Sequence, residues 1–316
     1  MAAWAAWLTA AWAVPAAPDD RHPADGEATV PRRFCPFWAP NRPLSAGTAL
    51  AMTPSEMFRS LYTAATGMVA QETQLDTIAN NLANANTHGY KRQRAEFEDL
   101  MYQTLKTPGR TPDGGMGPTG VQVGLGTRVL ATSRAFSQGS IEQTGNPLDI
   151  AIEGPGFLPV VNADGTMGFT RNGALKLDAQ GRVVTSAGLP LEPPLLVPTD
   201  ATGIIIGSDG QVSAQQPGQN EPTLIGQLQL ATFANPGGLD ALGHNLFRAT
   251  ASSGEPMIGA PAMEGRGGIM QGALEGSNVE VVSEMIGMIR AQRAYEVNSK
   301  VITAADEMLR NATNVR

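Results

Sequence analysis

The chain has 316 residues, of which 42% are hydrophobic and 16% charged, and its formal net charge at pH 7 is −7. This length allows one large domain or two ordinary ones, with enough hydrophobic residues for a packed core. The acidic balance and the lack of a basic run argue against nucleic acid as a partner. The body of the chain has no apolar stretch of about 18 residues or more, so no membrane-spanning helix is predicted there.

Residues 1–56 differ in composition from the rest and contain all four tryptophans and the only cysteine. Their first twenty residues resemble the apolar part of a signal peptide but lack its positive start. Three interpretations stay open: a signal peptide, a disordered tail, or upstream sequence read from a wrong start. We favour the last, because a helical pattern begins abruptly near Met52 or Met57. These interpretations leave three candidate translation starts, which are Met1, Met52 and Met57.

A long helix is predicted from about Ser55, within an N-terminal helical core segment at 57–100. Its apolar residues recur in alternating steps of three and four, interrupted only at Glu72, which is typical of a coiled-coil-like seam. Gly89 is the expected helix stop, and residues 90–105 are expected to form a second short helix. The apolar series is Phe58, Leu61, Ala65, Met68, Leu75, Ala79 and Leu82.

The middle of the chain is predicted to form extended structure followed by strands. Residues 101–127 are rich in Gly and Pro, which predicts an extended segment. Over 128–270 short apolar runs alternate with Asp/Gly-centred turns such as "NADGT", "DAQGR" and "GSDGQ". Such turns close hairpins, so we expect an all-β domain, either a barrel or a sandwich.

The last segment, 271–316, predicts a second long helix. Ser277 and Asn278 are its candidate N-caps. Its apolar positions persist for roughly thirty residues at helical spacing. Because no other long helix adjoins either of these two in sequence, they must pack against each other or against other copies. The predicted fold class is α+β, with long N- and C-terminal helices packing as a coiled-coil-like core and with a central all-β domain.

The sequence offers no catalytic, cofactor-binding or metal-binding constellation. Outside residues 1–56 the only histidines are His88 and His244, and neither has the spacing of a metal ligand or a catalytic triad. The glycines of "GLGTRV" and "GPGF" lack the strand–glycine-loop–helix order of a phosphate site. We therefore predict no cofactor, no metal and no enzymatic activity.

Motifs in all three parts of the chain resemble the bacterial flagellar rod and hook protein family. "ANNLANANTHGYKR" is similar to its N-terminal signature, and "DIAIEGPGFLPV" and "FTRNGALKLDAQGRVVTSAG" resemble its β domain. "GALEGSNVEVVSEMIGMIRAQRAYEVNSK" is similar to its C-terminal signature. The resemblance covers about residues 57–316 in the family's order. Within the family, "FEDLMYQTLKTPG" with the Gly/Pro-rich stretch after it looks most like the distal rod members.

This resemblance implies a structural subunit that stacks helically with its own copies into a hollow, periplasm-spanning rod carrying torque from motor to hook. Terminal helices would line the tube, and the β domain would form its outer layer. Implied partners are proximal rod proteins, the hook protein, the rod cap, the surrounding rings and the flagellar type III export apparatus. The alternatives are a hook or proximal rod protein, or, from another class, a secreted cell-wall hydrolase.

The resemblance and the helical patterns together predict an assembly interface. The asparagines of "TIANNLANANTHGY" attract attention because Asn is a mediocre helix former. Asn80 and Asn84 share a helix face, so they could fix the register between packed helices, or the asparagines could simply cap the turn before Gly89. The predicted interface comprises Phe58, Leu61, Ala65, Met68, Leu75, Asn80, Asn81, Leu82, Asn84, Gly89, Met285, Ile289, Tyr295, Asn298, Ile302 and Leu309.

Overall fold

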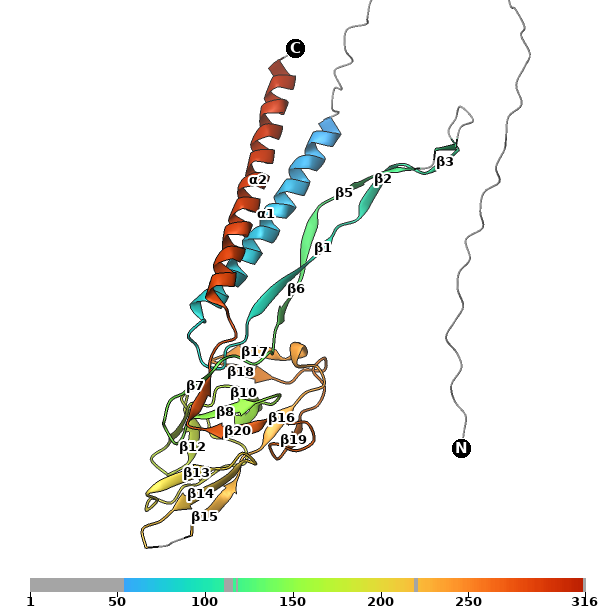
Figure 1. Ribbon diagram of the computed structural model, residues 1–316. Coiled ribbons are helices and arrows are strands. Elements are labelled where there is room, and N and C mark those ends of the chain that lie inside the picture. Colours follow the sequence, from blue (N-terminus) through green and yellow to red (C-terminus); the bar gives the residue numbers. More distant parts are fainter. Residues whose placement is uncertain (1–53, 111–115, 118, 219–220, 315–316) are drawn as a thin grey trace, which may run out of the picture. The chain divides into compact units, whose positions relative to one another are not determined.

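Two long helices dominate the N- and C-terminal parts of the computed structural model, which describes residues 54–110, 116–117, 119–218 and 221–314 (Figure 1). The prediction for residues 1–56 falls almost wholly outside this range. Helix α1 spans Pro54–Ala83 and helix α2 spans Val281–Asn314, and many strands separate them in sequence. The α+β class predicted from the sequence is therefore correct.

The two helices pack side by side in antiparallel directions (Figure 1). Small residues allow a close approach. A Cβ atom on Gly67 would lie 2.9 Å from Nδ2 of Asn298, and one on Gly287 would lie 3.4 Å from Cδ1 of Ile78. Several alanines are also buried in the two helices. These alanines are Ala64, Ala70, Ala291 and Ala305.

Both helix ends differ from their predicted positions. Helix α1 ends at Ala83 rather than Gly89, and the last asparagines lie in the turn that follows. Helix α2 begins at Val281, and Ser277 and Asn278 lie before it without capping it. The Asn278 side chain instead accepts a hydrogen bond from the backbone N–H of Arg92 at 2.7 Å, so it joins two segments of the chain.

A two-stranded antiparallel ribbon occupies the region after α1, where a second short helix was expected, so that prediction is wrong. Tertiary pairing explains the difference: one face of β1 lies against α1, which buries Ala95, and β1 bonds to a distant strand. The ribbon also includes residues 128–134, which the sequence analysis placed in the β domain. Its pairs are β1 (Gln93–Asp99) with β6 (Thr127–Arg134), β2 (Tyr102–Lys106) with β5 (Val121–Gly124), and β3 (Gly109–Arg110) with β4 (Met116–Gly117).

Residues 141–275 form many short antiparallel strands joined by turns and loops. The three predicted Asp/Gly turns close β9–β10, β11–β12 and β13–β14, with Gly165, Gly181 and Gly210 at positive φ. A four-stranded sheet has the order β17-β18-β10-β9, and a three-stranded sheet the order β13-β14-β15. The strands of these two sheets are β9 (Leu158–Val161), β10 (Met167–Thr170), β17 (Asp240–Gly243), β18 (Leu246–Arg248), β13 (Gly203–Ile206), β14 (Gln211–Gln215) and β15 (Thr223–Gln227).

The remaining strands form pairs. Strand β21 (Ala273–Glu275) pairs with β7 (Ile141–Gln143), and this places the residues just before α2 beside the start of the strand region. The short 3₁₀ helix η1 spans Pro236–Gly238. The other pairs are β8 (Ile150–Glu153) with β20 (Gly268–Gln271), β11 (Leu175–Leu177) with β12 (Val183–Thr185), and β16 (Leu230–Thr232) with β19 (Met257–Gly259).

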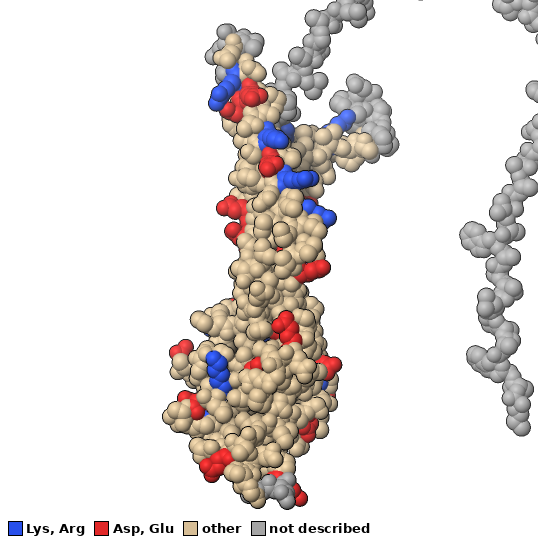
Figure 2. All heavy atoms as spheres, turned by 60° about the vertical axis from the view of Figure 1, so that its left-hand side comes forward, with Lys and Arg blue, Asp and Glu red and all other residues tan. Residues whose placement is uncertain are grey.

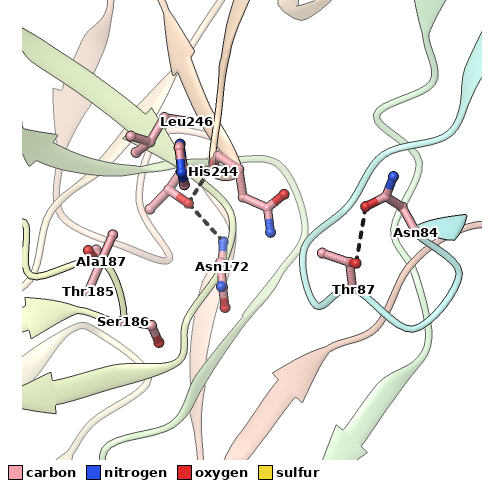
Figure 3. A pocket seen from close by; sticks show the side chains of 10 residues that line it. Asn84, Thr87, Asn172, Thr185, Ser186, Ala187, His244 and Leu246 are labelled. Carbon is pink, nitrogen blue, oxygen red and sulfur yellow. Dashed lines mark hydrogen bonds between the residues drawn. The ribbon is translucent and has the colours of Figure 1, made fainter. Parts of the chain in front are cut away.

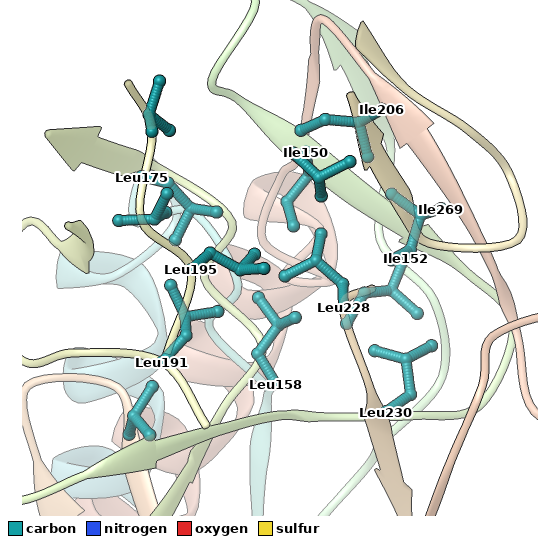
Figure 4. Packing of buried hydrophobic residues seen from close by; sticks show 14 residues of the cluster. Ile150, Ile152, Leu158, Leu175, Leu191, Leu195, Ile206, Leu228, Leu230 and Ile269 are labelled. Carbon is teal, nitrogen blue, oxygen red and sulfur yellow. The ribbon is translucent and has the colours of Figure 1, made fainter. Parts of the chain in front are cut away.

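Aliphatic side chains fill the interior between these strands, where Leu158, Val160 and Leu230 are fully buried (Figure 4). A second cluster beside it is aromatic. The rings of Phe169 and Phe233 meet edge to face, with centroids 4.9 Å apart. Edge-to-face contacts add to the stabilisation from area burial by about 0.5–1.5 kcal/mol per pair. The strand region therefore has its own core, separate from the helix contact.

Candidate functional site

Asn81, in the last turn of α1, has a carboxamide with partners on every side. Its Nδ2 donates to the carbonyl of Gln93 at 2.8 Å and to Oε2 of Glu284 at 3.3 Å. Its Oδ1 accepts from the N–H of Gln93 at 2.9 Å and lies 3.2 Å from the hydroxyl of Tyr90. An amide has two donors and two acceptor positions, and all are used here. Asn81 therefore connects α1, the start of β1 and α2.

Asn80 and Asn84 make local contacts instead. Nδ2 of Asn84 donates to the carbonyl oxygen of Asn80 at 2.9 Å, and Oδ1 of Asn84 accepts from the hydroxyl of Thr87 at 3.2 Å. Oδ1 of Asn80 accepts from the hydroxyl of Tyr90 at 2.8 Å. Burial raises the pKa of Tyr90, with Arg134 opposing and Glu284 reinforcing the rise, so the hydroxyl keeps its proton. Within the chain, Asn84 thus satisfies a carbonyl at the end of α1.

A buried ionic cluster, here called the junction cluster, consists of Lys91, Arg171 and Glu275, which are 0%, 3% and 1% exposed. Nζ of Lys91 lies 2.7 Å from Oε1 of Glu275, and Nε of Arg171 lies 2.5 Å from Oε2. The N–H of Gly139 also donates to Oε1 at 2.9 Å. The carboxylate therefore holds both cations from opposite oxygens.

Backbone carbonyls accept further hydrogen bonds from both cations of the junction cluster. Lys91 donates to the carbonyl of Ser137 at 2.8 Å, and Arg171 donates to those of Gly156 at 3.0 Å and Gly154 at 2.7 Å. Buried charges are tolerated only when paired and hydrogen-bonded in this way. The cluster therefore fixes the segment after α1, the end of β10 and the strand before α2 to one another.

Gly89 explains how the backbone reaches this cluster. Its φ is +71°, and a Cβ atom there would lie 2.8 Å from the backbone nitrogen of Asn172. A side chain would meet that backbone, so the position requires glycine. The N–H of Gly89 donates to the carbonyl of Glu275 at 2.8 Å. Gly89 is thus buried within the chain, and its role in the monomer is close backbone contact.

The electrostatics of the junction cluster make it sensitive to acid. Burial would raise the pKa of Glu275, but Arg171 and hydrogen bonds from Arg171, Lys91 and Gly139 lower it below its ordinary value of 4.5. For Lys91, burial and the neighbouring Arg171 lower the pKa, against the opposing effect of Glu275. At neutral pH the carboxylate is therefore ionised between its two basic partners.

We expect the stability of the folded chain to fall in acid because of this carboxylate. A carboxyl whose folded pKa is depressed contributes full stability above its unfolded pKa, here near 4.5, and loses it as pH falls through the folded pKa. One such group contributes a slope of at most about 1.4 kcal/mol per pH unit. Urea unfolding between neutral and strongly acid pH measures the slope. Glu275→Gln should have a shallower acid slope than the wild type, and equal slopes would contradict the assignment.

A shallow polar hollow of about 450 Å³ lies near the junction (Figure 3). Asn84 and Thr87 line one side, and Asn172, Ser186 and His244 line the other. His244 and the next residue form a two-residue hairpin turn with positive φ, as type I′ turns require. No residue lining this hollow carries a carboxylate or a thiol, so it offers hydrogen bonding rather than a catalytic acid–base pair.

Within the ranges that the structure describes, no set of three or more His, Cys, Asp or Glu is placed to hold a metal ion, and neither long helix is apolar enough to cross a membrane. The face shown in Figure 2 is largely uncharged, with Lys and Arg interspersed with Asp and Glu rather than gathered into one basic field. This face gives no electrostatic basis for nucleic-acid binding.

The predicted interface residues divide into three groups. Asn81 and Gly89 are buried within the chain. Six are exposed: Phe58, Ala65, Asn80, Met285, Ile289 and Tyr295. Eight are half-buried, and of these Asn298 lies in the contact between α1 and α2. The half-buried residues are Leu61, Met68, Leu75, Leu82, Asn84, Asn298, Ile302 and Leu309.

The junction cluster was not anticipated from sequence. Lys91, Arg171 and Glu275 each lie in a different family-like motif, namely "ANNLANANTHGYKR", "FTRNGALKLDAQGR" and "GALEGSNVE". Charged residues inside otherwise apolar or glycine-rich motifs are the sequence signal that could have located the cluster.

The exposed apolar helix faces and the polar junction define the chain as a structural protein built for contact with other polypeptides.

Comparison with known proteins leads to the same class. Three family models match: the flagella basal body rod protein model over residues 61–91, the flagellar hook protein FlgE/F/G D1 domain over 151–214, and the flagellar basal body rod FlgEFG protein C-terminal model over 270–315. Each matched segment contains one member of the junction cluster.

Relatives match over nearly their whole length. The flagellar basal-body rod protein FlgG of Borreliella burgdorferi is 48% identical over 264 residues, covering 82% of this chain and 99% of the relative. FlgG of Caulobacter vibrioides is 46% identical over 260 residues, covering 82% and 99%. FlgG of Agrobacterium fabrum is 48% identical over 252 residues, covering 79% and 96%.

The chain belongs to the flagellar basal-body rod protein family. It is a structural protein of the flagellar basal body and not an enzyme, as the sequence predicted. The relatives are named as rod proteins, so neither the hook protein nor the cell-wall hydrolase alternative is favoured. Family membership also indicates assembly with other flagellar components.

Proposed function

We propose that this chain is a subunit of the distal rod, in which its copies stack helically into a hollow shaft that transmits torque from the motor to the hook. The helices α1 and α2 would form a coiled-coil-like inner layer, and residues 128–270 would act as an all-β outer domain. The proximal rod proteins, the hook protein, the rod cap, the surrounding rings and the flagellar type III export apparatus are the proposed partners.

The observation that carries this proposal is the exposure of large apolar residues along both helices. Phe58 of α1 is 63% exposed, and Met285 and Ile289 of α2 are 52% and 49% exposed. A long helix derives most of its stability from packing an apolar face. Large apolar residues exposed along a helix in this way mark a protein–protein interaction site. Neighbouring subunits would cover it in a polymer.

The two-stranded ribbon supports the same proposal. All five residues of β2 are exposed, including Tyr102 and Leu105. A two-stranded ribbon on its own is only marginally stable in water. Contact with a neighbouring subunit would stabilise it, which fits a role for residues 101–127 between subunits rather than inside the strand core.

The direct test replaces the gene with a tagged copy in the bacterium that encodes it, followed by electron microscopy of purified basal bodies. We expect the tag along the distal part of the rod, and cells without the gene should lack that part and fail to swim. A tag confined to the hook or to the proximal rod would support the alternative axial roles. Complete rods in the deletion strain would refute the proposal.

A further inference from the structure

An exposed stripe runs along α1 on the side away from α2. Its members are spaced in steps of four and three, which places them on one face of the helix. Phe58, Tyr62 and Val69 are 63%, 57% and 60% exposed. The stripe is apolar toward the start of the helix and acidic toward its end. This α1 outer stripe comprises Phe58, Tyr62, Ala65, Val69, Glu72 and Asp76, all exposed.

A second exposed stripe with the opposite charge runs along α2. Its steps are three and four residues, so its members also share one face. Val297, Val301 and Met308 are 58%, 42% and 43% exposed. The stripe begins with two arginines and continues as an apolar series. This α2 outer stripe comprises Arg290, Arg293, Val297, Val301, Ala304 and Met308, all exposed.

The two stripes lie at the same levels along the helix pair. Gly67 is opposite Asn298, and Ile78 is opposite Gly287, which fixes the antiparallel register of α1 and α2. With this register and a rise of about 1.5 Å per residue, Glu72 is level with Arg293 and Asp76 with Arg290. The apolar members match in the same order.

The charged side chains of these stripes lack partners among the residues that the structure describes. In the described part of the protein, Glu72, Asp76, Arg290 and Arg293 make neither an ion pair nor a side-chain hydrogen bond. Like charges three or four residues apart on a helix repel each other. Each stripe therefore carries a local electrostatic cost that an oppositely charged partner would remove.

The α1 outer stripe also borders a groove. Tyr62, Ala65 and Val69 form one wall, and Leu100 and Val129 of the ribbon region form the other. The groove has a volume of about 590 Å³ and a mainly apolar lining. A helix with an apolar face fits such a groove through residues at steps of three and four.

We propose that the α2 outer stripe of one copy docks on the α1 outer stripe of a second copy that lies beside it in the same orientation. Glu72 and Asp76 of one copy then face Arg293 and Arg290 of the next, and Val69 faces Val297. This contact rests on the proposed rod function and specifies which helix faces meet and in which register. Each copy has one stripe of each kind. It can therefore bind one neighbour through its α1 outer stripe and another through its α2 outer stripe, so the contact repeats from copy to copy.

Charge reversal tests this pairing. In the bacterium that encodes the chain, we expect the pair Glu72→Arg/Asp76→Arg to reduce complete rods at least tenfold, because both stripes become basic. The pair Arg290→Glu/Arg293→Glu should do the same, because both stripes become acidic. The four changes together restore complementary charge, so rods and swimming should recover. Co-expression of the two double variants should also give rods, since each supplies the partner that the other needs.

The control matched to Glu72→Arg/Asp76→Arg is Asp164→Arg/Glu221→Arg. It makes the same change in net charge, but on exposed residues of the strand region. It should leave rods unchanged. Circular dichroism of each purified variant checks folding. Normal rods in either double variant, or no recovery in the folded fourfold variant, would overturn the pairing while leaving the rod function intact. Complete rods in the strain that lacks the gene would instead refute the proposed rod function.

Discussion

Glu275→Gln is expected to lower the free energy of unfolding by about 3–5 kcal/mol, because it leaves buried charges uncompensated. Lys91 and Arg171 would then share a neutral group inside the protein. The glutamine amide nitrogen would also face one of these donors, since both carboxylate oxygens now accept hydrogen bonds. Urea unfolding at neutral pH, followed by circular dichroism, measures the change.

The matched control is Glu142→Gln, an exposed carboxylate on β7, the strand that pairs with β21. Surface changes of this kind usually fall within about 0.5 kcal/mol of the wild type. If Glu275→Gln unfolds at the same urea concentration as Glu142→Gln, the junction cluster contributes no net stability. A loss of stability confined to Glu275→Gln supports its role in joining the helices to the strand region.

Asn81→Leu is expected to cost about 2–4 kcal/mol, because it leaves the N–H and carbonyl of Gln93 and one oxygen of Glu284 without their partner. Arg92 lies 2.5 Å from the other oxygen of Glu284, but no directed hydrogen bond satisfies that oxygen. Removal of Asn81 therefore leaves the carboxylate of Glu284 with its ion pair to Arg92 alone among the described residues. Amide exchange at the start of β1 should become faster than in the wild type.

Asn84→Leu is the contrasting variant. Asn84 is half-buried, and the hydrogen bonds of its side chain within the described residues are to Asn80 and Thr87 of the same turn, so leucine should change monomer stability by less than about 1 kcal/mol. If Asn84 also sets the register between copies, the same variant should give short or missing rods despite a stable monomer. Equal losses of monomer stability for Asn81→Leu and Asn84→Leu would show that neither amide has the specific role described.

The sequence predicts some elements well because their determinants are local. The periodicity of apolar residues locates both helices, and Asp/Gly turns locate three hairpins. The ribbon was missed because residues 93–99 contain Arg, Ala and Glu, which favour helix when tertiary contacts are ignored. Their strand conformation depends on β6, which lies far along the chain, and on the adjoining face of α1.

The junction cluster could not be derived from local pattern for a related reason. Lys91 and Arg171 are 184 and 104 residues from Glu275 in sequence, yet all three meet in the interior. Each of these charged residues, considered alone in the sequence, would be expected on the surface of the protein. The asparagine run was noticed for its poor helix propensity, but the fully bonded member is Asn81, whose partners in β1 and α2 are visible only in the folded chain.

The contacts between the helices and the strand region have a mechanical consequence. Gly89, Lys91 and Asn278 all bond near the single strand that leads into α2, so the chain enters and leaves the strand region at one place. A pull or twist applied to the helices would load these bonds side by side, and they would have to break together. Such a joint would resist force up to a threshold and would then open in one cooperative step, because its bonds would not break one after another from one end.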